Sequence, residues 1–391
     1  METYESARNR VVHVGGVRFS YRRLGRPHGL PLLLLMGFRG TMDHWDPALV
    51  NPLAARRPVI LVDNAGVGRS GGEVPETFAG WVRHYVDVLE ALGVKRVDLM
   101  GYSMGGCVAQ LLALAAPTLV RRLVLCGTTP SAGEGVTRAP IGPFNQLKDA
   151  VTNEEHRQAF LDTFFSRSDL SQAAGRAAWD RIANARADRL PYLGSEGART
   201  QAVAFAKFMD PNQASEASFD RFHELRLPVL IANGSHDLLL PTENSIIMWR
   251  NLRHADAQLH LYPDSGHGFL YQYADTFSAL VNEFLDRPAV GGDSGSRLRR
   301  QNGYVKHAEA SRHAQVTKVE PSDAGSRASE SMAGKEWRGK TRHGTAWQDQ
   351  GVWGQPHEQC SLGGPEDARN RSCTGGPGSG APAPSGGGGN E

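Results

Sequence analysis

Residues 97–106 of this chain read VDLMGYSMGG, and this stretch decides its fold. An apolar strand pattern over 97–100 ends at the motif Gly101-Tyr102-Ser103-Met104-Gly105, and an apolar helix pattern follows over 104–116. A sharp turn from strand to helix would lift the hydroxyl oxygen of Ser103 clear of its neighbours, where a base can take its proton. The flanking glycines are needed because such a turn brings the two backbones too close for most side chains. The alternative is a glycine-rich turn that carries a surface serine.

Strand and helix patterns alternate on both sides of this turn. A hairpin is predicted over 11–21, and later strands are expected at 31–36, 58–62, 121–126, 228–232 and 257–262. Helix patterns occupy 76–92, 242–252 and 270–286. The alternation predicts an α/β fold with a doubly wound, mostly parallel sheet.

The alternation breaks between residues 129 and 227, where the sequence has no apolar strand run. Helix patterns near 153–166, 171–187, 196–209 and 215–225 predict a helical lid (129–227) between two parts of the core, 1–128 and 228–289. Its apolar side chains are Phe160, Phe164, Phe165, Trp179, Phe205, Phe208, Met209 and Phe222. Taken singly, each is best interpreted as packing within the lid, whereas together they suggest an apolar pocket over Ser103.

The composition changes from residue 290 onward. Residues 291–391 include only six Leu, Ile, Val or Phe and twenty Gly, which is too little apolar surface to offset the entropy of ordering the chain. We therefore predict a disordered, glycine-rich tail over 290–391. A mistranslated or engineered extension is one alternative. Another is a segment that folds on an unknown partner, for which Trp337, Trp347 and Trp353 would be the anchors.

Charge and hydropathy exclude several classes of protein. Residues 1–290 hold 30 Lys/Arg and 30 Asp/Glu, which argues against a nucleic-acid-binding surface. The longest dense apolar run, Leu30–Met36, is far too short to span a bilayer, and the N-terminus lacks the apolar region of a secretory signal. We expect a cytoplasmic protein that does not enter the membrane.

Cysteine spacing and glycine motifs argue against bound metals and nucleotides. The four cysteines form no C-x-x-C pair, so a zinc site has no support. The glycine-rich loop at 63–72 lacks the G-K-[ST] ending of a phosphate-binding loop. It is interpreted as a structural loop that Asp63 and Arg69 pin in place. We expect neither a metal nor a cofactor.

A serine nucleophile needs a histidine base, which in turn needs an orienting carboxylate. In an open α/β sheet such groups come from loops at the carboxyl ends of the strands. His267 lies in the loop after the strand at 257–262, between two glycines, and Asp237 follows the strand at 228–232. Asp264 is a competitor for the carboxylate, but it lies on the same short loop as His267, which makes its approach awkward. A solvated loop histidine is the alternative interpretation of His267.

Acyl transfer also needs two N–H donors for the developing oxyanion. The N–H of Met104 is the first candidate, and the N–H of Phe38 is the second, because Gly37 permits a tight turn after the strand at 31–36. A plain strand-to-helix loop is the alternative here. The neighbouring Arg39 could pair with a substrate carboxylate, although a solvated arginine is the simpler interpretation.

Over residues 10–287 the chain resembles the α/β-hydrolase superfamily. The resemblance rests on Met36-Gly37-Phe38, the loop from Asp63 to Ser70, the Ser103 turn, and the chain order Ser103, Asp237, His267. The segment 103–130 is similar to that of enol-lactonases and small carboxylesterases. The chain departs from the family at Met36-Gly37, where His-Gly is usual, and at Asn64-Ala65, where an Arg-Gly pair is common.

The resemblance implies a serine hydrolase with a helical lid and no cofactor, acting on an ester or lactone of a small to medium, largely apolar molecule. Two alternatives remain. The same three residues could hydrolyse a carbon–carbon bond or carry out cofactor-free perhydrolysis. A receptor-like protein that binds a ligand and turns it over slowly is the other.

Overall fold

The computed structural model describes residues 1–288, within which eight strands form one sheet in the order β1-β2-β4-β3-β5-β6-β7-β8. Their bounds are β1 Arg10–Val14, β2 Val17–Gly25, β3 Leu32–Leu35, β4 Pro58–Val62, β5 Val97–Tyr102, β6 Val120–Cys126, β7 Val229–Gly234 and β8 Ala257–Tyr262. The first two strands form a hairpin, and β2 pairs antiparallel with β4. All pairings from β4 through β3 to β8 are parallel. This confirms the predicted doubly wound sheet.

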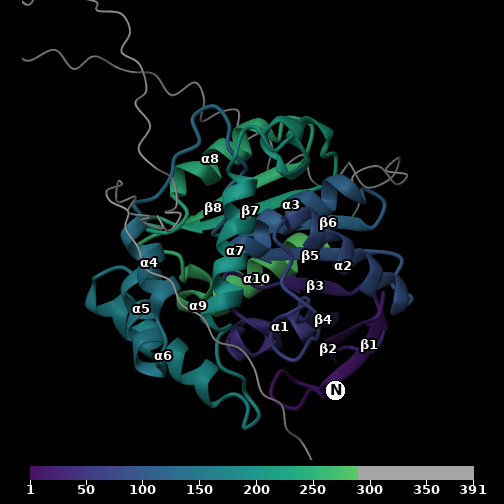
Figure 1. Cartoon of the computed structure of the whole chain (residues 1–391), viewed down its shortest axis with the longest axis horizontal. Coiled ribbons are helices and arrows are strands. Elements are labelled where there is room, and N and C mark those ends of the chain that lie inside the picture. The colour runs from purple at the N-terminus through teal and green to yellow at the C-terminus, as the bar shows by residue number, and fades with distance from the viewer. Residues whose placement is uncertain (289–391) are drawn as a thin grey trace, which may run out of the picture. The chain divides into compact units, whose positions relative to one another are not determined.

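Helices cover both faces of the sheet, and the strands β3 and β4 are accordingly apolar throughout (Figure 1). In β3, Leu32 and Leu34 belong to one apolar core, and Leu33 and Leu35 belong to the other. The first core is completed by α1 (Pro47–Ala54), α9 (Phe269–Gln272) and α10 (Ala274–Asp286). The second is completed by α2 (Phe78–Ala91), α3 (Met104–Ala115) and α8 (Thr242–Asn251). Alternate residues of one strand thus stabilise opposite layers, as expected for a buried parallel strand.

The segment between β6 and β7 is helical, and we call residues 129–227 the helical insertion. It contains α4 (Ile141–Asp149), α5 (Asn153–Phe164), α6 (Asp169–Asn184), α7 (Ser195–Phe208), and the 3₁₀ helices η2 (Ala214–Glu216) and η3 (Phe219–Glu224). In Figure 1, α4, α5 and α6 gather at the left of the strand-bearing body. A capping box starts α5: the Thr152 side chain accepts the backbone N–H of Glu155, and the Glu155 side chain accepts the backbone N–H of Thr152.

Several predicted elements differ from those in the structure. The helix α4 was not predicted: its first turn contains Gly142 and Pro143, and all nine of its residues are at least partly exposed, so it has no buried apolar face to reveal it. The short helices α1 and η1 (Met42–His44) were also unpredicted. The helix predicted at 215–225 is wrong and is replaced by η2 and η3. The helix predicted at 270–286 is interrupted at Tyr273, between α9 and α10.

The aromatic side chains of the helical insertion mostly serve its packing. Six of the eight apolar residues expected to face a pocket are buried in the two cores: Phe160, Phe165, Trp179, Phe208, Met209 and Phe222. Phe205 packs at the edge of the second core, and Phe164 at the edge of the first. The interpretation of each residue as packing therefore holds for most of the set.

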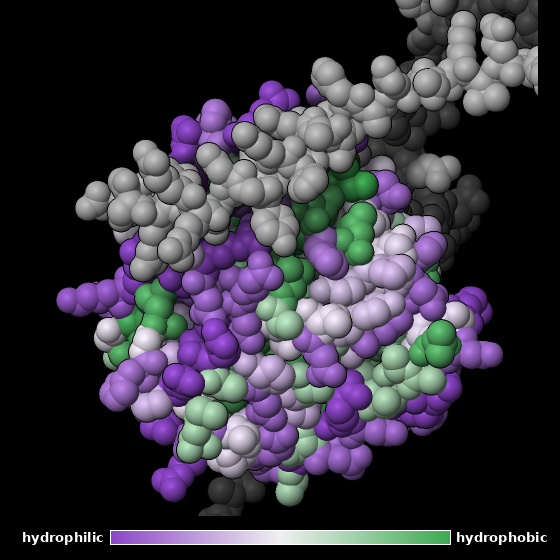
Figure 2. All heavy atoms as spheres, turned by 180° about the vertical axis from the view of Figure 1, so that it is seen from behind, coloured by the Kyte–Doolittle hydropathy of each residue, from purple (hydrophilic) through white to green (hydrophobic). Residues whose placement is uncertain are grey.

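Figure 2 shows mainly hydrophilic side chains on the visible face of the described residues, with hydrophobic ones in separate groups. The large apolar side chains that are exposed come from many elements: Met1, Val11, Ile141, Val151, Leu170, Val203, Leu238, Trp249 and Leu261. Among residues 1–288, the helices are all too short or too polar to cross a bilayer. The predicted tail, 290–391, and its possible partner lie outside the described residues.

Candidate active site

Ser103 stands at the turn between β5 and α3, in a backbone conformation that side chains rarely adopt. Its φ is 58° and its ψ is −126°, a region that costs about 1–3 kcal/mol for residues other than glycine. The turn is held by the Ser103 N–H, which donates to the Cys126 carbonyl at 2.9 Å, and by the Thr128 hydroxyl, which donates to the Ser103 carbonyl at 2.8 Å. Strain maintained in this way at a single serine points to a role for its hydroxyl group.

The glycines around Ser103 are present because backbones meet there. A Cβ atom on Gly105 would lie 2.2 Å from the Leu35 carbonyl oxygen, and one on Gly101 would lie 2.3 Å from the Gly105 carbonyl oxygen. A Cβ atom on Gly37 would lie 2.7 Å from the Ser103 Cβ and 3.3 Å from its Oγ. The close approach expected of the motif is therefore confirmed, and the loop after β3 lies directly against the serine.

His267 and Asp237 form a buried hydrogen-bonded pair. The Nδ1 atom of His267 lies 2.7 Å from Oδ2 of Asp237, and both side chains are at most 1% exposed. The other carboxylate oxygen, Oδ1, accepts the backbone N–H groups of Leu239 and Leu240, each at 2.9 Å. Both carboxylate oxygens are thus occupied, so Asp237 can orient the imidazole of His267 and leave its Nε2 atom as the basic nitrogen.

Several contacts place the His267 ring beside the Ser103 turn. The phenol of Tyr102, the residue before the serine, donates to the His267 carbonyl at 3.1 Å, and the two rings lie 4.9 Å apart. A Cβ atom on Gly127 would lie 3.3 Å from Nδ1 of His267. Gly127 directly follows Cys126, the hydrogen-bond partner of Ser103. The structure therefore brings the three sequence-predicted residues to the same carboxyl edge of the sheet.

The competing carboxylate, Asp264, has a different set of partners. Its two carboxylate oxygens accept the hydroxyl groups of Ser166 and Ser168, both at 2.5 Å, and these donors lower the pKa of Asp264. The backbone N–H of Gly268 also donates to the Phe164 carbonyl at 2.7 Å. The loop that carries His267 is thus attached to the α5–α6 junction of the helical insertion. Asp264 does not hold the imidazole.

The proposed oxyanion donors flank the serine. Met104 is the first residue of α3, and Phe38 follows Gly37 in the loop after β3. Among the loop and turn hydrogen bonds of residues 1–288, neither residue's backbone N–H is a donor. The Phe38 ring packs 4.9 Å from that of Phe144 in α4, a neighbour that sequence reasoning missed together with its helix. The Phe164 ring lies edge-on to that of His267 at 5.0 Å. Phe38, Phe144 and Phe164 thus bring aromatic rings to the proposed oxyanion loop and to His267.

Arg39 does not extend into solvent as the sequence suggested. Its side chain is buried, and its guanidinium donates to four backbone carbonyls of the helical insertion. Burial lowers its pKa. The guanidinium of Arg39, next to Phe38, is thus already bound to carbonyls of the protein. Pairing of Arg39 with a substrate carboxylate receives no support.

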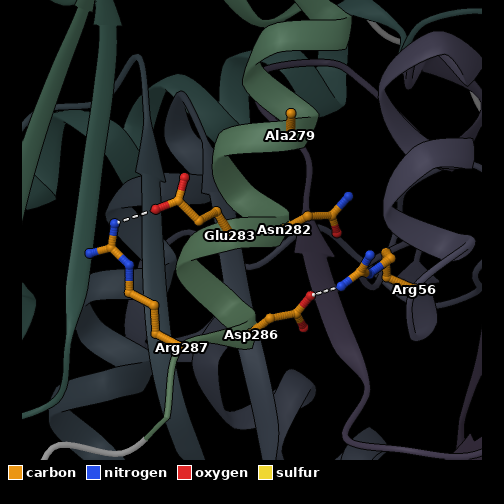
Figure 3. A pocket seen from close by; sticks show the side chains of 6 residues that line it. All are labelled: Arg56, Ala279, Asn282, Glu283, Asp286 and Arg287. Atoms are coloured by element: carbon orange, nitrogen blue, oxygen red, sulfur yellow. Dashed lines mark hydrogen bonds and ion pairs between the residues drawn. The ribbon is translucent and has the colours of Figure 1, made fainter. Parts of the chain in front are cut away.

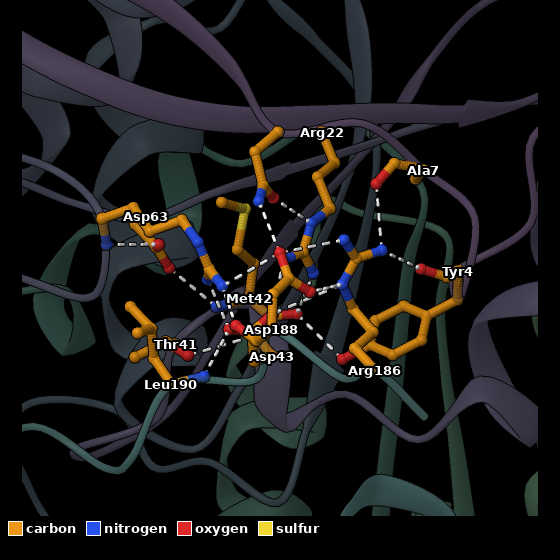
Figure 4. A network of polar contacts seen from close by, with 12 residues as sticks. Tyr4, Ala7, Arg22, Thr41, Met42, Asp43, Asp63, Arg186, Asp188 and Leu190 are labelled. Atoms are coloured by element: carbon orange, nitrogen blue, oxygen red, sulfur yellow. Dashed lines mark hydrogen bonds and ion pairs between the residues drawn. The ribbon is translucent and has the colours of Figure 1, made fainter. Parts of the chain in front are cut away.

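The loop at 63–72 is structural, as expected. Its Asp63 carboxylate accepts the N–H of Arg69 at 3.0 Å and the N–H of Met42 at 2.7 Å, and burial raises the pKa of Asp63 to about 6. Arg69 also binds the fully buried Asp43, which pairs with Arg22 (Figure 4). This network joins the loop, β2, η1 and the 186–190 segment of the helical insertion.

A pocket is present at the far end of the sheet, but it is not the site. It is lined by Arg56, Ala279, Asn282, Glu283, Asp286 and Arg287 (Figure 3). Its charged groups are paired with one another, since Arg56 binds Asp286 at 2.7 Å and Arg287 binds Glu283 at 2.8 Å. Arg56 precedes β4, so this pocket lies at the amino ends of the strands, opposite the chemistry. Within residues 1–288, we find no cluster of three or more His, Cys, Asp or Glu side chains arranged to hold a metal ion.

Comparisons with known proteins agree with this architecture. The family model described as the alpha/beta hydrolase fold matches residues 31–272. A 2-hydroxymuconate semialdehyde hydrolase of Pseudomonas sp. (strain CF600) is 30% identical over 288 residues, covering 71% of this chain and 93% of that protein. A candidate carbamate hydrolase (RutD) of Azorhizobium caulinodans is 42% identical over 261 residues, covering 66% of this chain and 91% of that protein.

Solved structures give the same result. An alpha/beta hydrolase fold protein from Chitinophaga pinensis matches with a TM-score of 0.66 and 28% identity, covering 73% of this chain and all of that one. The enol-lactonase from Burkholderia xenovorans LB400 matches with a TM-score of 0.57 at 20% identity, covering 71% of this chain and all of that one. The second likeness concerns the fold alone.

Proposed function

The chain belongs to the α/β-hydrolase family and is a hydrolase, and we propose that it cleaves a carboxylic ester or lactone with Ser103, His267 and Asp237. The observation that carries the proposal is the strained backbone of Ser103 beside the buried His267–Asp237 pair. A serine held in a strained turn between strand and helix is the geometry that a nucleophile requires, and a carboxylate-bound imidazole is the geometry of its base.

In this mechanism, the Nε2 atom of His267 takes the hydroxyl proton as Oγ of Ser103 attacks the substrate carbonyl. The 2.7 Å contact with Asp237 keeps the other imidazole proton on Nδ1, so that Nε2 is the free base. The imidazolium then gives its proton to the leaving alcohol, and an acyl-enzyme remains. Water, activated by the same imidazole, releases the acid.

The N–H groups of Phe38 and Met104 would bind the developing oxyanion. Loss of one such donor typically lowers kcat by about 10²–10³. These donors are rigid because Gly37 lies against Ser103 and because Met104 begins a buried helix. The aromatic groups near the site, Phe38, Phe144 and Phe164, favour a small to medium, largely apolar substrate beneath a lid formed by the helical insertion.

A second candidate is hydrolysis of a carbon–carbon bond by the same three residues. It is favoured by the likeness over 71% of the chain to a 2-hydroxymuconate semialdehyde hydrolase. Such a substrate would also present a carbonyl to Ser103 and to the oxyanion donors. The shape of the acyl and leaving-group pockets decides between the two reactions.

Labelling with a fluorophosphonate probe tests the site. The probe should label the wild-type protein, and labelling should be lost in Ser103→Ala and strongly reduced in His267→Ala. Ser235→Ala is the matched control, because the Ser235 hydroxyl also lies 2.7 Å from a histidine nitrogen, Nδ1 of His236, but in an exposed contact. This variant should keep full labelling. Undiminished labelling of Ser103→Ala would contradict the proposal.

A substrate panel then separates the two reactions. Aryl esters, lactones and vinylogous diketones should be compared by kcat/KM, with Ser103→Ala as the blank. Preference for esters or lactones supports the first proposal, and preference for vinylogous diketones supports the second. Turnover that is independent of Ser103 would reject both.

A further inference from the structure

Arg39 joins the loop after β3 to the helical insertion through its side chain and its backbone. Its Nε donates to the Leu193 carbonyl at 2.7 Å, and its Nη1 donates to the carbonyls of Leu147, Lys148 and Ala150 at 2.9, 3.1 and 2.7 Å. Its backbone N–H donates to Oε1 of the buried Gln201 in α7 at 2.7 Å, and its carbonyl accepts the Leu193 N–H at 2.9 Å. Arg39 thus binds the insertion through its guanidinium, its backbone N–H and its backbone carbonyl.

The contacts at α4 have a specific physical meaning. The last carbonyls of a helix have no partner within the helix and carry the negative end of its dipole. The Arg39 guanidinium, a buried cation, supplies donors to three carbonyls at the end of α4, where the C-cap residue Ala150 has extended backbone. All nine residues of α4 are at least partly exposed, so apolar burial contributes little to its position. Arg39 is therefore a principal attachment of this helix.

The same residue has an unfavourable backbone. Its φ is 59°, in the left-handed region that favours glycine. The contacts with α4, Leu193 and Gln201 hold this conformation. The bond from the Arg39 N–H to Gln201 orients the peptide between Phe38 and Arg39, and this peptide directly adjoins the Gly37–Phe38 peptide that carries the Phe38 N–H. Strain that is maintained next to a reacting group is a recognised form of preorganisation.

We propose that Arg39 is a positioning residue that couples the helical insertion to the oxyanion donor of Phe38. The N–H of Phe38 then adopts its catalytic direction only while α4 and the segment before α7 rest on Arg39. The packing of the Phe38 ring against that of Phe144 in α4 supports the same coupling. This inference rests on the proposed function, because it gives the Phe38 N–H an oxyanion to bind.

Two variants and one matched control test the coupling. Arg39→Lys keeps the charge but cannot form four hydrogen bonds from a planar fork. Arg39→Gly removes the side chain and relieves the backbone strain, so it should fold even where the lysine variant does not. Arg181→Lys is the control: Arg181 joins α6 to Asp46, the N-cap residue of α1, at 2.6 Å, and so anchors the same insertion without a contact to Phe38 or Arg39 among those described.

The first readout is the rate constant for fluorophosphonate labelling of Ser103, measured per folded protein well below the unfolding temperature. It does not depend on the substrate. Both Arg39 variants should label about 10–100-fold more slowly, a smaller loss than deletion of a donor, and kcat on the best substrate should fall while KM stays nearly constant. Arg181→Lys should change the labelling rate by less than about 3-fold. Wild-type labelling rates in folded Arg39→Gly would overturn the inference.

The second readout is independent of turnover. Backbone hydrogen exchange over residues 37–41 should be faster in Arg39→Gly than in the wild type, together with exchange over 141–150, and it should be unchanged there in Arg181→Lys. Unchanged exchange at 37–41 would also overturn the inference. A wild-type protein that is not labelled at all, but shows the coupled exchange, would reject the proposed function and leave the mechanical coupling established.

Discussion

Two helices beside the candidate site, α3 and α4, are held in opposite ways. Eleven of the twelve residues of α3 are buried, and its backbone touches β3 closely enough that only glycine fits at position 105. All nine residues of α4 are partly exposed, and its end is bonded to Arg39. The sheet body therefore fixes Ser103 by close packing, whereas α4 is placed largely by polar contacts. Close packing is costly to alter, and single polar contacts can be removed one at a time.

The largest effect is expected from adding one methyl group at the turn. In Gly105→Ala, the new Cβ would meet the Leu35 carbonyl at 2.2 Å and the Met36 carbonyl at 2.7 Å. Because both obstacles are backbone atoms, we expect little or no folded protein, as measured by circular dichroism and thermal unfolding.

Gly142→Ala in α4 is its counterpart, since a Cβ there has nothing within 4 Å. This variant should leave the fold intact and raise stability by up to about 0.5 kcal/mol through helix propensity. Equal changes of folding and stability in Gly105→Ala and Gly142→Ala would contradict the distinction between α3, held by close packing, and α4, held by polar contacts.

The second comparison concerns two carboxylates on neighbouring loops. Asp237→Asn should lower kcat by about 10⁴ because the amide would favour the wrong imidazole tautomer. Asp264→Asn should lower kcat by less than about 10-fold, because Asp264 binds Ser166 and Ser168 and does not touch the imidazole. Asparagine also tolerates the φ of 44° at this position.

Steady-state rates on one substrate and circular dichroism of both variants check this prediction. Comparable losses of kcat in two well-folded proteins would reassign the orienting carboxylate.

A smaller effect should appear as pH dependence of stability. His156 in α5 stacks on Tyr192 at 4.5 Å, and its burial, together with the charge of Arg39, lowers its pKa from 6.5 to about 4. Between pH 4 and 6.5 the His156 side chain of the unfolded chain binds a proton, and that of the native chain does not. The free energy of unfolding therefore falls as the pH drops through this window, whereas above pH 6.5 the contribution of His156 is fully present.

His156→Phe should keep the stacking and lose part of this dependence. The unfolding midpoint in urea at pH 7.5 and pH 5 is the measurement. Burial also lowers the pKa of His44, so this residue should account for part of the pH dependence that remains in His156→Phe. The same difference between the two pH values in wild type and variant would contradict the prediction.

The smallest effect is expected at the exposed ion pair between α7 and the segment before α2. Lys207 lies 3.0 Å from Glu76, and the two side chains are 34% and 67% exposed. Lys207→Ala should change the free energy of unfolding by less than about 1 kcal/mol. A double-mutant cycle with Glu76→Ala measures the pair itself, and a coupling well above that value would mean that this contact also anchors the insertion.

The positions of Ser103, Asp237 and His267 in the fold could be predicted because each depends on a short-range rule. The serine lies between a strand and a helix pattern, and the other two follow strands that must end at the same edge of a parallel sheet. The hydrogen bond between Asp237 and His267, 30 residues apart, then follows from topology. The helix α4 could not be predicted, because its stability depends on a residue that lies about 110 positions earlier in the chain.

The sequence by itself determined the α/β-hydrolase fold, the nucleophile turn and the order of its three candidate residues, because apolar periodicity and glycine spacing act locally. Only the tertiary structure decided that Arg39 is an internal anchor, that Asp264 holds the insertion, and that Phe144 and Phe164 reach the site. These contacts join segments separated by about 100 residues, and no local pattern shows which distant carbonyl or hydroxyl group a side chain will meet.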